Sequence, residues 1–369
     1  MERVVMLVDL DYFFAQAEET RNPAIRDKPV VVCVYSGRSE DSGAVSTSNY
    51  LARKYGVRSG MQIFMAKKKL ENVEAVFLPI DHDFYDETSR KVMDILRTYA
   101  DSFEQVGVDE AFLDVSQKTG RDFEKARRLA EEIKDDVRAK LNLTCSIGIG
   151  SNKLIAKIAA DSQKPDGLTV VKPEGVQSFL FPLSIDRLIG VGVKTKEKMQ
   201  SLGINTIGEL ATYDARKLTS VFGRRLGGYF HNAALGLDDE PVAEKGEAES
   251  ISRISTLKQD TRDMSLILLK TDQLCDEIHS TIQKQLLSFK AVAIIAITTD
   301  MTAHAKSKTL ENPTSDVEIM KQVVKELLAK FLNETQLEIR RVGVKIANFS
   351  KEQDAQKQLT SFIEPAKTD

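Results

Sequence analysis

The sequence has few residues of the types that build disulfide frameworks and most metal centres. Its three cysteines, Cys33, Cys145 and Cys275, are odd in number and far apart, which fits neither a disulfide scaffold nor a zinc site. Its four histidines are also widely separated and leave little for a histidine-based metal site or a Ser-His-Asp triad. We therefore expect buried thiols in a reducing compartment, and any chemistry must depend on carboxylates.

Long apolar runs and an excess of charge are missing as well. The run from 291 to 297 is far shorter than the ~20 residues needed to cross a bilayer. The net charge of −3 predicts neither a nucleic-acid binder nor an acidic tail, so a DNA-binding surface would have to be local. We expect a soluble, cytoplasmic protein with no membrane partner.

The first half of the chain predicts a ferredoxin-like domain. A chain of 369 residues is too long for one core and should form several domains. Apolar periodicity predicts the order β-α-β-β-α-β, in which strand ends converge on one face of the sheet, with an insertion between residues 13 and 78. The predicted elements are strand 4–8, helix 12–19, strand 30–35, helices 49–54, 63–70 and 85–99, strands 102–108 and 111–115, helix 122–141, strand 144–149 and a helix from 152.

The second half predicts helices, a linker and another α/β unit. From residue 172 short helices alternate with glycines, and residues 238 to 249 lose apolar periodicity and gather acidic residues, which is typical of a linker. Residues 250 to 349 again predict β-α-β-β-α-β, without visible sequence identity to the first unit. Residues 350 to 369 are polar and predict a flexible tail.

Three carboxylates are placed where strands end. Asp9 closes the first strand, and Asp109 and Glu110 lie between two strands of the same predicted sheet. At ~4 Å and an effective dielectric near 20, each pair of like charges costs roughly 4 kcal/mol, so such a cluster needs protons or cations. Oxygen ligands favour Mg²⁺ or Mn²⁺, and a pair of these ions supports phosphoryl or nucleotidyl transfer. Spacing alone leaves open that these three acids are ordinary turn residues without a catalytic role. The nearby Asp11 is predicted to be a helix N-cap.

Six ordered segments resolve that choice, because together they resemble the DinB-like Y-family DNA polymerases, especially the archaeal members, over nearly the whole chain. The resemblance implies an α+β multidomain protein, a right-hand polymerase with a ferredoxin-like palm, small fingers, a helical thumb and a second β-α-β-β-α-β little finger. The segments are Val-Asp-Leu-Asp-Tyr-Phe-Phe-Ala-Gln from residue 8, Lys-Pro-Val-Val-Val-Cys from 28, Ser-Gly-Ala-Val from 42, Asn-Tyr-Leu-Ala-Arg-Lys-Tyr-Gly-Val from 49, Val-Asp-Glu-Ala-Phe-Leu-Asp from 108 and Ala-Lys-Ile-Ala-Ala-Asp from 156.

The resemblance also implies domain boundaries. The expected divisions are palm 1–12 and 79–171, fingers 13–78, thumb 172–237, linker 238–249, little finger 250–349 and a flexible tail 350–369.

By the same resemblance, Asp9, Asp109 and Glu110 are the catalytic carboxylates that hold two Mg²⁺ ions, for which Mn²⁺ could substitute. The main-chain carbonyl of Leu10 is a further metal ligand. The implied nucleotide-binding residues combine donors suited to a triphosphate with aromatic side chains near the sugar, where Phe14 would act as a steric gate against ribose; they are Phe13, Phe14, Thr47, Tyr50, Arg53 and Lys164. Small or apolar residues would form an open roof over the templating pair: Val34, Gly43, Ala44 and Gly60.

DNA contacts are implied in the thumb and the little finger. Gly190 and Gly192 resemble a helix-hairpin-helix loop whose main-chain N–H groups approach phosphates without reading sequence. Alone, such a pattern is more often a helix end followed by a turn. In the little finger the expected phosphate contacts are Arg253, Lys306, Lys308, Arg340 and Arg341, with weak, salt-sensitive binding.

Two positions depart from the family pattern. Gly107 stands where members often have Ser, which removes a hydroxyl close to the metals, and Ile189 stands where Pro is common. The tail resembles a sliding-clamp (PCNA-type) binding box formed by Gln356, Leu359, Phe362 and Ile363, with Ile363 in place of an aromatic residue.

The expected activity is template-directed DNA synthesis past damaged bases by a DNA polymerase that transfers nucleotides from dNTPs to a primer. The implied enzyme has low fidelity, is distributive, lacks proofreading, and works as a cytoplasmic, nucleoid-associated monomer in DNA repair. Its partners would be primer-template DNA, dNTPs and the clamp. Two other classes remain as alternatives: a nucleotidyl cyclase, and a nonenzymatic DNA-binding scaffold with an inert palm.

Overall fold

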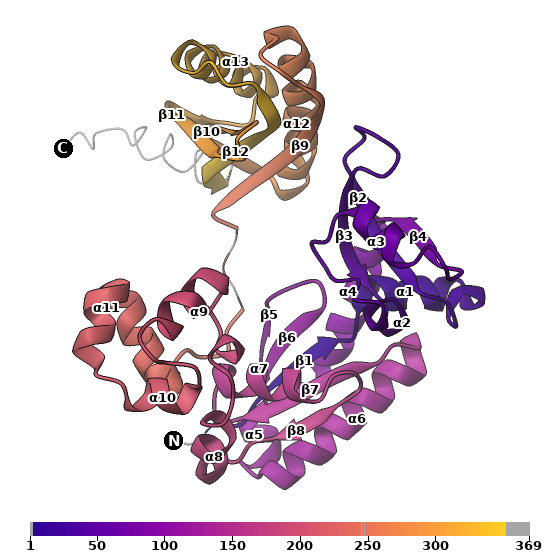
Figure 1. The fold of residues 1–369 in the computed structure, drawn as a ribbon, viewed down its shortest axis with the longest axis vertical. Helices are drawn as coiled ribbons and strands as arrows, with labels where there is room; N and C mark the ends of the chain where they lie inside the picture. Colours follow the sequence, from indigo (N-terminus) through magenta and orange to yellow (C-terminus); the bar gives the residue numbers. More distant parts are fainter. Residues whose placement is uncertain (1–2, 245, 247, 352–369) are drawn as a thin grey trace, which may run out of the picture. The chain divides into compact units, whose positions relative to one another are not determined.

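The computed structural model describes residues 3–244, 246 and 248–351. The chain divides into two compact units (Figure 1). The first comprises Met1–Cys33, Val45–Met61 and Ala66–Lys245, and the second comprises Val34–Ala44, Gln62–Met65 and Gly246–Asp369. In the described ranges, no helix is long and apolar enough to cross a bilayer.

A five-stranded sheet lies at the centre of the first unit. Its order is β5-β6-β1-β7-β8, and the central strand β1 pairs antiparallel with both β6 and β7. The short β8 joins the edge in parallel with β7. The strands are β1 (Val5–Leu10), β5 (Ser102–Gln105), β6 (Glu110–Asp114), β7 (Cys145–Gly150) and β8 (Leu168–Val170).

The two faces of this sheet bury different helices because side chains alternate along each strand. Val4, Met6 and Val8 belong to a core with residues of α4 (His82–Tyr99) and α6 (Phe123–Leu141). Val5 and Leu7 face the other way, toward α7 (Lys153–Ser162). The Asp9 side chain therefore lies on the same face of the sheet as Val5 and Leu7, the face that α7 covers. The order of the elements confirms the predicted β-α-β-β-α-β arrangement.

The insertion between β1 and α4 forms a small α/β segment. It contains α1 (Phe13–Arg21), a 3-10 turn (Pro23–Ile25), α2 (Tyr50–Lys54) and α3 (Ile63–Lys69) together with a three-stranded sheet ordered β3-β2-β4. β2 (Val30–Tyr35) was expected from the sequence, whereas β3 (Gly43–Ser48) and β4 (Val76–Pro79) were not. Asn49 caps α2 through the main-chain N–H of Ala52 and also accepts from the N–H of Val30, which fixes the helix to the strand.

Residues 173 to 234 form the helical segment that the glycine pattern predicts. It contains α8 (Val176–Leu180), α9 (Val193–Gln200), α10 (Ile207–Thr212) and α11 (Ala215–Ala234), and two 3-10 turns, Pro173–Gly175 and Ile185–Arg187. Gly223 has a φ of 81° inside α11, so this helix is two helices joined at a kink. The core of the segment also takes in Leu154, Ile155 and Ile158 of α7.

The first part of the segment expected to be a linker is packed against the five-stranded sheet. Val242 is 6% exposed and lies in a cluster with Val5, Leu7 and Phe112. The Arg3 guanidinium donates to the carbonyls of Asp238 and Glu240, at 2.9 Å each. An acidic, aperiodic sequence is therefore ordered here by contacts with distant residues.

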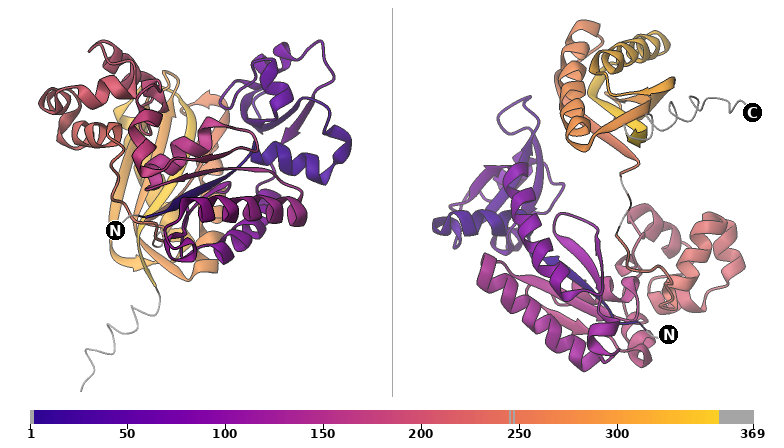
Figure 2. Two further views of the ribbon diagram at one scale, coloured as in Figure 1. Left: turned by 90° about the horizontal axis from the view of Figure 1, so that it is seen from below. Right: turned by 180° about the vertical axis from the view of Figure 1, so that it is seen from behind.

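The second unit contains the other β-α-β-β-α-β domain. Its four-stranded sheet has the order β11-β10-β12-β9 and is antiparallel throughout. Both helices cover one face, where Val342, Val344 and Ile346 of β12 join their apolar residues (Figure 2). The elements are β9 (Ser250–Thr261), α12 (Met264–Gln285), β10 (Leu287–Thr298), β11 (Ala303–Thr314), α13 (Val317–Glu334) and β12 (Ile339–Lys351).

Candidate active site

Strand pairing brings the three predicted carboxylates to one end of the five-stranded sheet. Asp9 and Glu110 are directly opposite each other in the β1–β6 register, so their side chains share the α7 face. The main-chain N–H of Leu10 donates to the carbonyl of Asp109 at 2.8 Å, which holds Asp109 at the same strand end. The acids come from two strands about 100 residues apart, but main-chain hydrogen bonds place them together.

The pKa values show that the acids influence one another. Burial raises the pKa of Asp9 to about 6, with the charge of Asp109 acting in the same direction and Lys164 opposing it. Burial also raises the pKa of Asp109, and the adjacent Glu110 charge raises it further. Partly buried carboxylates that repel one another gain most from a bound cation.

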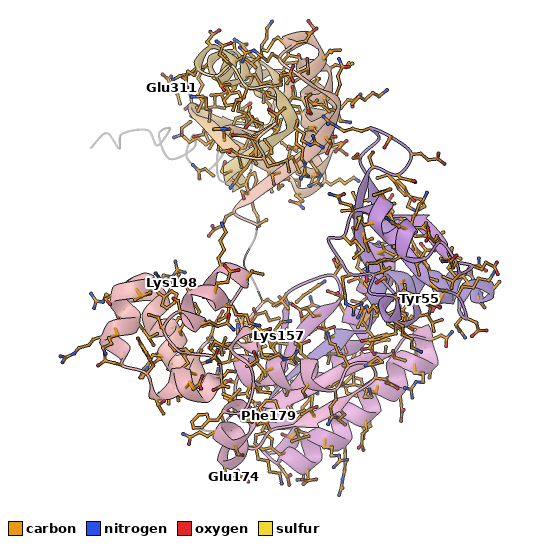
Figure 3. All side chains as sticks on the ribbon, viewed as in Figure 1. Tyr55, Lys157, Glu174, Phe179, Lys198 and Glu311 are labelled. Atoms are coloured by element: carbon orange, nitrogen blue, oxygen red, sulfur yellow. The ribbon has the colours of Figure 1, made fainter. Side chains whose placement is uncertain are left out.

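Two lysines of the α7 region lie against these acids. Lys164 Nζ is 2.7 Å from Asp9 Oδ2, and Lys157 forms an ion pair with Glu110. Figure 3 labels Lys157 on its helix. Among the described residues, no group of three His, Cys, Asp or Glu side chains is already arranged to hold a metal ion.

The residues nevertheless fit a divalent cation in their chemistry. The side-chain donors are all carboxylate oxygens, which Mg²⁺ and Mn²⁺ prefer, and the Leu10 carbonyl would add another oxygen. Asp9 and Glu110 each face a cation in the form of a lysine ammonium, so both already point toward positive charge. Movement of Lys157 and Lys164 would free those oxygens for metal.

Gly107 leaves space beside the acids. A Cβ at this position would lie 3.1 Å from Asp109 Oδ1 and 3.4 Å from Glu110 Cγ. The first separation is tighter than most Cβ contacts, so a serine would press on the Asp109 carboxylate. The Asp109 carboxylate would have to shift by a few tenths of an ångström to accommodate a side chain at position 107.

The predicted triphosphate contacts Tyr50 and Arg53 form a stacked pair. The Arg53 guanidinium lies 4.7 Å from the Tyr50 ring centroid, and its Nε donates to the Ser48 carbonyl at 2.9 Å. Burial raises the pKa of Tyr50, the charges of Asp11 and Asp9 raise it further, and those of Arg53 and Lys164 lower it. The structure therefore brings Tyr50 and Arg53 close to the Lys164 and Asp9 pair.

Two neighbouring phenylalanines of α1 have different surroundings. Phe13 is 3% exposed and lies in the main core. Phe14 is half-buried and stacks on Tyr85 with ring centroids 4.3 Å apart and an interplanar angle of 13°. The Tyr85 hydroxyl donates to Glu18 Oε1 at 2.7 Å. Phe14 therefore sits on a rigid aromatic support, which suits a side chain that excludes by its bulk.

The other predicted nucleotide and roof residues lie on or beside β2 and β3. Thr47 is half-buried on β3, and Val34 on β2 is 46% exposed. Gly43 has a φ of 142°, and a Cβ there would approach the Val34 carbonyl to 2.2 Å, so only glycine fits. Ala44 forms an isolated bridge with Gln62, while Gly60 has a φ of 82° and open space around it.

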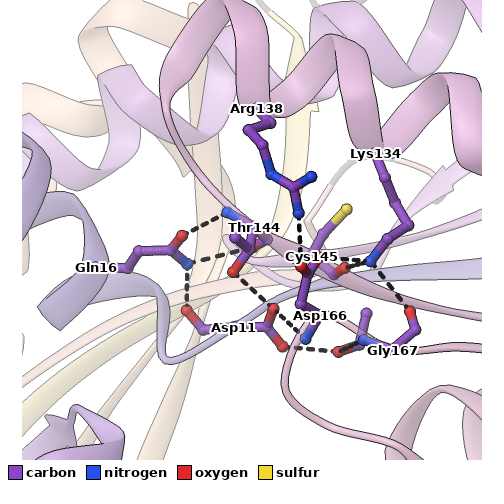
Figure 4. Close-up of polar contacts among 9 residues, drawn as sticks. Asp11, Gln16, Lys134, Arg138, Thr144, Cys145, Asp166 and Gly167 are labelled. Atoms are coloured by element: carbon purple, nitrogen blue, oxygen red, sulfur yellow. Dashed lines mark hydrogen bonds and ion pairs between the residues drawn. The ribbon is translucent and has the colours of Figure 1, made fainter.

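Sequence reasoning missed the role of Asp11. The predicted N-cap is wrong: Tyr12 is the N-cap residue of α1, and no side chain caps the helix. The Asp11 carboxylate instead accepts hydrogen bonds from Thr144, Ser146 and the main chain of Asp166 (Figure 4). These partners are more than 130 residues away in sequence, so no local pattern could reveal them.

Two glycines shape the main chain of the predicted helix-hairpin-helix loop. Gly190 has a φ of 85°, where its Cβ would be 3.5 Å from the Tyr229 ring, and Gly192 is the N-cap of α9. The Tyr229 hydroxyl donates to the Ile189 carbonyl at 2.9 Å and ties the loop to α11. The main-chain N–H groups at the start of α9 are thus available to an anion.

The predicted cations of the second unit do not share one surface. Lys306 and Lys308 pair with Glu334 and Glu326 of α13, so they lie on the helix-covered side of the sheet. Arg341 is opposite Ile297 and Thr256, on the face without helices, and its Nε has no hydrogen-bond partner. Arg340 lies 3.4 Å from Asp260, and exposed Arg253 donates to the Ser252 carbonyl. The predicted clamp-binding residues 356–363 lie outside the described residues.

Three protein-family matches follow one another along the chain. Residues 8–161 match the impB/mucB/samB family, residues 248–361 match the C-terminal domain of that family, and residues 186–238 match the thumb domain described as DNA polymerase-iota. DNA polymerase IV of Nitrosopumilus maritimus is 47% identical over 98% of this chain and 99% of its own. DNA polymerase IV 1 of Methanosarcina mazei is 46% identical over 98% and 100%.

Solved structures agree with the sequence matches. The Y-family DNA polymerase chimera Dbh-Dpo4(243-245)-Dbh is similar with a TM-score of 0.89 and 35% identity, over 95% of this chain and 100% of that one. The insertion ternary complex of Dbh DNA polymerase matches with a TM-score of 0.68 and 35% identity over the same shares. The fold and these relatives define a DNA-directed DNA polymerase with palm, fingers, thumb and little finger.

The chain belongs to the DinB-like Y family of DNA polymerases. Membership implies the use of divalent metal ions.

Proposed function

We propose that this polymerase adds deoxynucleotides to a primer by two-metal-ion catalysis at Asp9, Asp109 and Glu110, and that it copies damaged templates. The observation that carries the proposal is the β1–β6 register, which puts Asp9 opposite Glu110 on the α7 face. A pair of Mg²⁺ ions bound there would activate the primer 3′-hydroxyl and offset the charge that develops on the departing pyrophosphate. The acids, with the Leu10 carbonyl, would supply the oxygen ligands.

The chain's own cations would bind the triphosphate. Arg53 is held by its stack on Tyr50, and an ordered guanidinium loses little freedom when it binds a phosphate. Lys164, which contacts Asp9 here, would exchange that carboxylate for phosphate oxygens. The Tyr50 hydroxyl would add a neutral donor and Thr47 would complete the pocket, while Phe13, buried in the core, would support Phe14 from beneath the surface.

Selection of the sugar would depend on Phe14. Its ring is backed by Tyr85 and cannot retreat without disturbing a buried hydrogen bond, so a ribose 2′-hydroxyl would clash with it. Small residues Gly43, Ala44 and Gly60, with Val34, would leave room for distorted template bases. Low fidelity and synthesis past lesions would follow from that space.

DNA would be gripped mainly through its backbone. The start of α9, with Gly190 and Gly192, offers main-chain N–H groups, and Arg341 presents a cation on the open face of the little-finger sheet. Lys306 and Lys308 are paired with α13 acids and would have to leave them to reach DNA. Because Lys306 and Lys308 already pair with acids, we expect weak, salt-sensitive binding and distributive synthesis.

The remaining parts of the proposal concern partners and setting. Gln356, Leu359, Phe362 and Ile363 would bind a PCNA-type sliding clamp, and the enzyme would act on the nucleoid as a monomer, without proofreading. The alignment with DNA polymerases along the chain gives no support to a nucleotidyl cyclase or a nonenzymatic scaffold.

Primer extension on an undamaged template and on one with a single abasic site tests the proposal. With Mg²⁺ and dNTPs, the parent should extend both primers, whereas Asp109→Ala should extend neither. Glu131→Ala is the matched control, because this exposed acid of α6 forms an ion pair with Arg127, at 3.4 Å, on the same helix. Obligatory stalling of the parent at the abasic site would count against lesion bypass, and extension by Asp109→Ala would overturn the assignment of the site.

A further inference from the structure

Three segments far apart in the sequence meet at the buried carboxylate of Asp11. This residue directly follows β1 and is 1% exposed. Its Oδ2 accepts from Thr144 Oγ1 at 2.8 Å and from the main-chain N–H of Asp166 at 2.9 Å, and its Oδ1 accepts from Ser146 Oγ at 2.7 Å. One carboxylate thus joins the end of β1 to the start of β7 and to the turn that follows α7 (Figure 4).

The same turn is held from its other side by α6. Lys134 Nζ donates to Asp166 Oδ1 at 2.7 Å, and Arg138 Nη2 donates to Asp166 Oδ2 at 2.5 Å. Lys134 also reaches the carbonyls of Cys145, at 2.7 Å, and Gly167, at 3.3 Å. Asp166 is therefore fixed through its side chain by α6 and through its main chain by Asp11.

Neighbouring contacts leave this arrangement little room to move. The Gln16 amide donates to the Asp11 carbonyl at 2.6 Å and to the Thr144 carbonyl at 3.2 Å. At Gly167, even a Cβ would come within 2.0 Å of the Gln163 carbonyl. The turn is tightly packed and hydrogen-bonded, so its position depends on these few partners.

Lys164 begins the turn that Asp11 holds. Only Pro165 separates it from Asp166, so the hydrogen bond from the Asp166 N–H limits where the Lys164 main chain can lie. From there Lys164 Nζ reaches Asp9 Oδ2 at 2.7 Å and Asp161 Oδ1 at 3.1 Å. Loss of the Asp11 carboxylate would release the turn and with it the base of the Lys164 side chain.

The hydrogen bonds of Asp11 also separate its role from that of Asp9. All three of its donors are neutral protein groups, and a metal ion would have to displace them from a buried site. Asp9, by contrast, faces an ammonium group that can move away. The geometry therefore assigns the two aspartates of one short segment to different tasks.

We propose that Asp11 is a positioning residue for nucleotide binding, which holds the turn 164–167 so that Lys164 reaches the triphosphate of the incoming nucleotide. The inference rests on the proposed role of Lys164 and goes beyond it. Asp11 acts only through Lys164, so its removal should weaken nucleotide binding and leave DNA binding unchanged.

A double-mutant cycle on the full-length protein tests this coupling. Single-nucleotide insertion gives the dNTP Kd and the insertion rate, fluorescence anisotropy gives the DNA Kd, and thermal melting gives the Tm. Asp11→Ala should raise the dNTP Kd about tenfold, as Lys164→Ala should, because losing one charge-assisted contact has about that effect. The dNTP Kd of the double variant should be no higher than that of the single variant with the higher Kd. The DNA Kd should not change.

Two further variants separate positioning from general loss of stability. Asp11→Asn should recover most of the nucleotide affinity, because its Oδ1 can still accept from the Asp166 N–H while its amide donates to Ser146 Oγ. Ser116→Ala is the matched control, because it removes a buried partner of the Val4 N–H, at 2.9 Å, near the other end of β1. It should lower the Tm without changing the dNTP Kd.

The outcomes distinguish the inference from the function on which it rests. An unchanged dNTP Kd in Asp11→Ala, or effects that multiply in the double variant, would overturn the positioning role alone. An unchanged dNTP Kd in Lys164→Ala would overturn both the role of Lys164 and that of Asp11. If Asp11→Ala does not fold, Thr144→Val removes one of the three hydrogen bonds, and it must then raise the dNTP Kd, or the inference fails.

Discussion

Asp9 and Glu110 are register partners across β1 and β6, and each side chain contacts a lysine from the α7 region. The partnership is set by main-chain hydrogen bonds, so it exists before any metal or nucleotide binds. Strand pairing thus presents Asp9 and Glu110 on one face of the palm sheet, where Lys164 and Lys157 lie against their carboxylates.

The steric gate is tested by shortening Phe14. Phe14→Ala should raise ribonucleotide incorporation, relative to deoxynucleotide incorporation, about 10- to 100-fold, the usual scale for rejecting a substrate by the fit of a pocket. The ratio of kcat/KM for dNTP and rNTP measures this. Phe123→Leu, which removes a buried aromatic ring elsewhere in the same core, is the control. An unchanged ratio in Phe14→Ala would rule out the gate.

The buried pair Lys153 and Glu104 should be important for stability but not for catalysis. Lys153 Nζ lies 2.9 Å from Glu104 Oε2, and the two side chains are 8% and 5% exposed. Lys153→Met should lower the free energy of unfolding by about 3 kcal/mol, because it leaves a buried charge without its main partner. Adding Glu104→Gln should recover much of this loss in urea denaturation. Equal stability of the single and double variants would show that the unpaired Glu104 charge does not cause the loss of stability.

The buried cysteines predict a loss of stability at high pH. Burial raises the pKa values of both Cys145 and Cys275 to about 12, from an ordinary value of 9.0. Below pH 9 both the folded and unfolded states keep these protons, so the thiols do not affect stability. Above pH 9 the unfolded state loses them first, and stability should fall as the pH rises toward 12.

Urea unfolding between pH 8 and 10.5 measures this effect, with Cys145→Ser and Cys275→Ala together as the comparison. The variant should lose less stability over that interval than the parent. A thiol reagent at pH 8 should label none of the three cysteines until the protein unfolds, because all are buried. Rapid labelling of the folded protein would contradict the assigned burial.

The clamp-binding box is tested by removing the tail. Deletion of residues 355 to 369 should abolish stimulation by a PCNA-type clamp and leave basal extension within about twofold, because a tethered ligand acts by raising effective concentration. Replacing Leu359 and Phe362 by alanine in the full chain should have the same effect. Equal stimulation of the parent and both variants would refute the assignment.

The sequence predicted those features that depend on local patterns. The apolar run ending at Asp9 and the Asp-Glu pair between two strands were sufficient to expect a shared edge, because apolar periodicity and strand order are local properties. The short strands β4 and β8 were missed because three or four residues carry too little periodicity. Asp11 was misread as a cap because Ser146, Thr144 and Asp166 reach it from distant segments.

The linker shows a further limit of sequence reasoning. Acidic residues without apolar periodicity predict a solvated segment, but Val242 packs into an apolar cluster of the sheet, and Arg3 binds the neighbouring carbonyls. Likewise, the sequence could not show that acids of α13 pair with Lys306 and Lys308, whose contact with DNA stays a prediction. In each case the deciding partner belongs to another element of the fold.

The most direct test of the central claim is the number of divalent cations at the acidic site. Mn²⁺ titration followed by electron paramagnetic resonance, with a dideoxy-terminated primer-template and a matching dNTP, should show two bound ions in the parent complex. Asp9→Asn and Asp109→Asn should each lose at least one of them, while Glu131→Ala keeps both. Two bound ions in all four proteins would show that the metals lie elsewhere and would contradict the account.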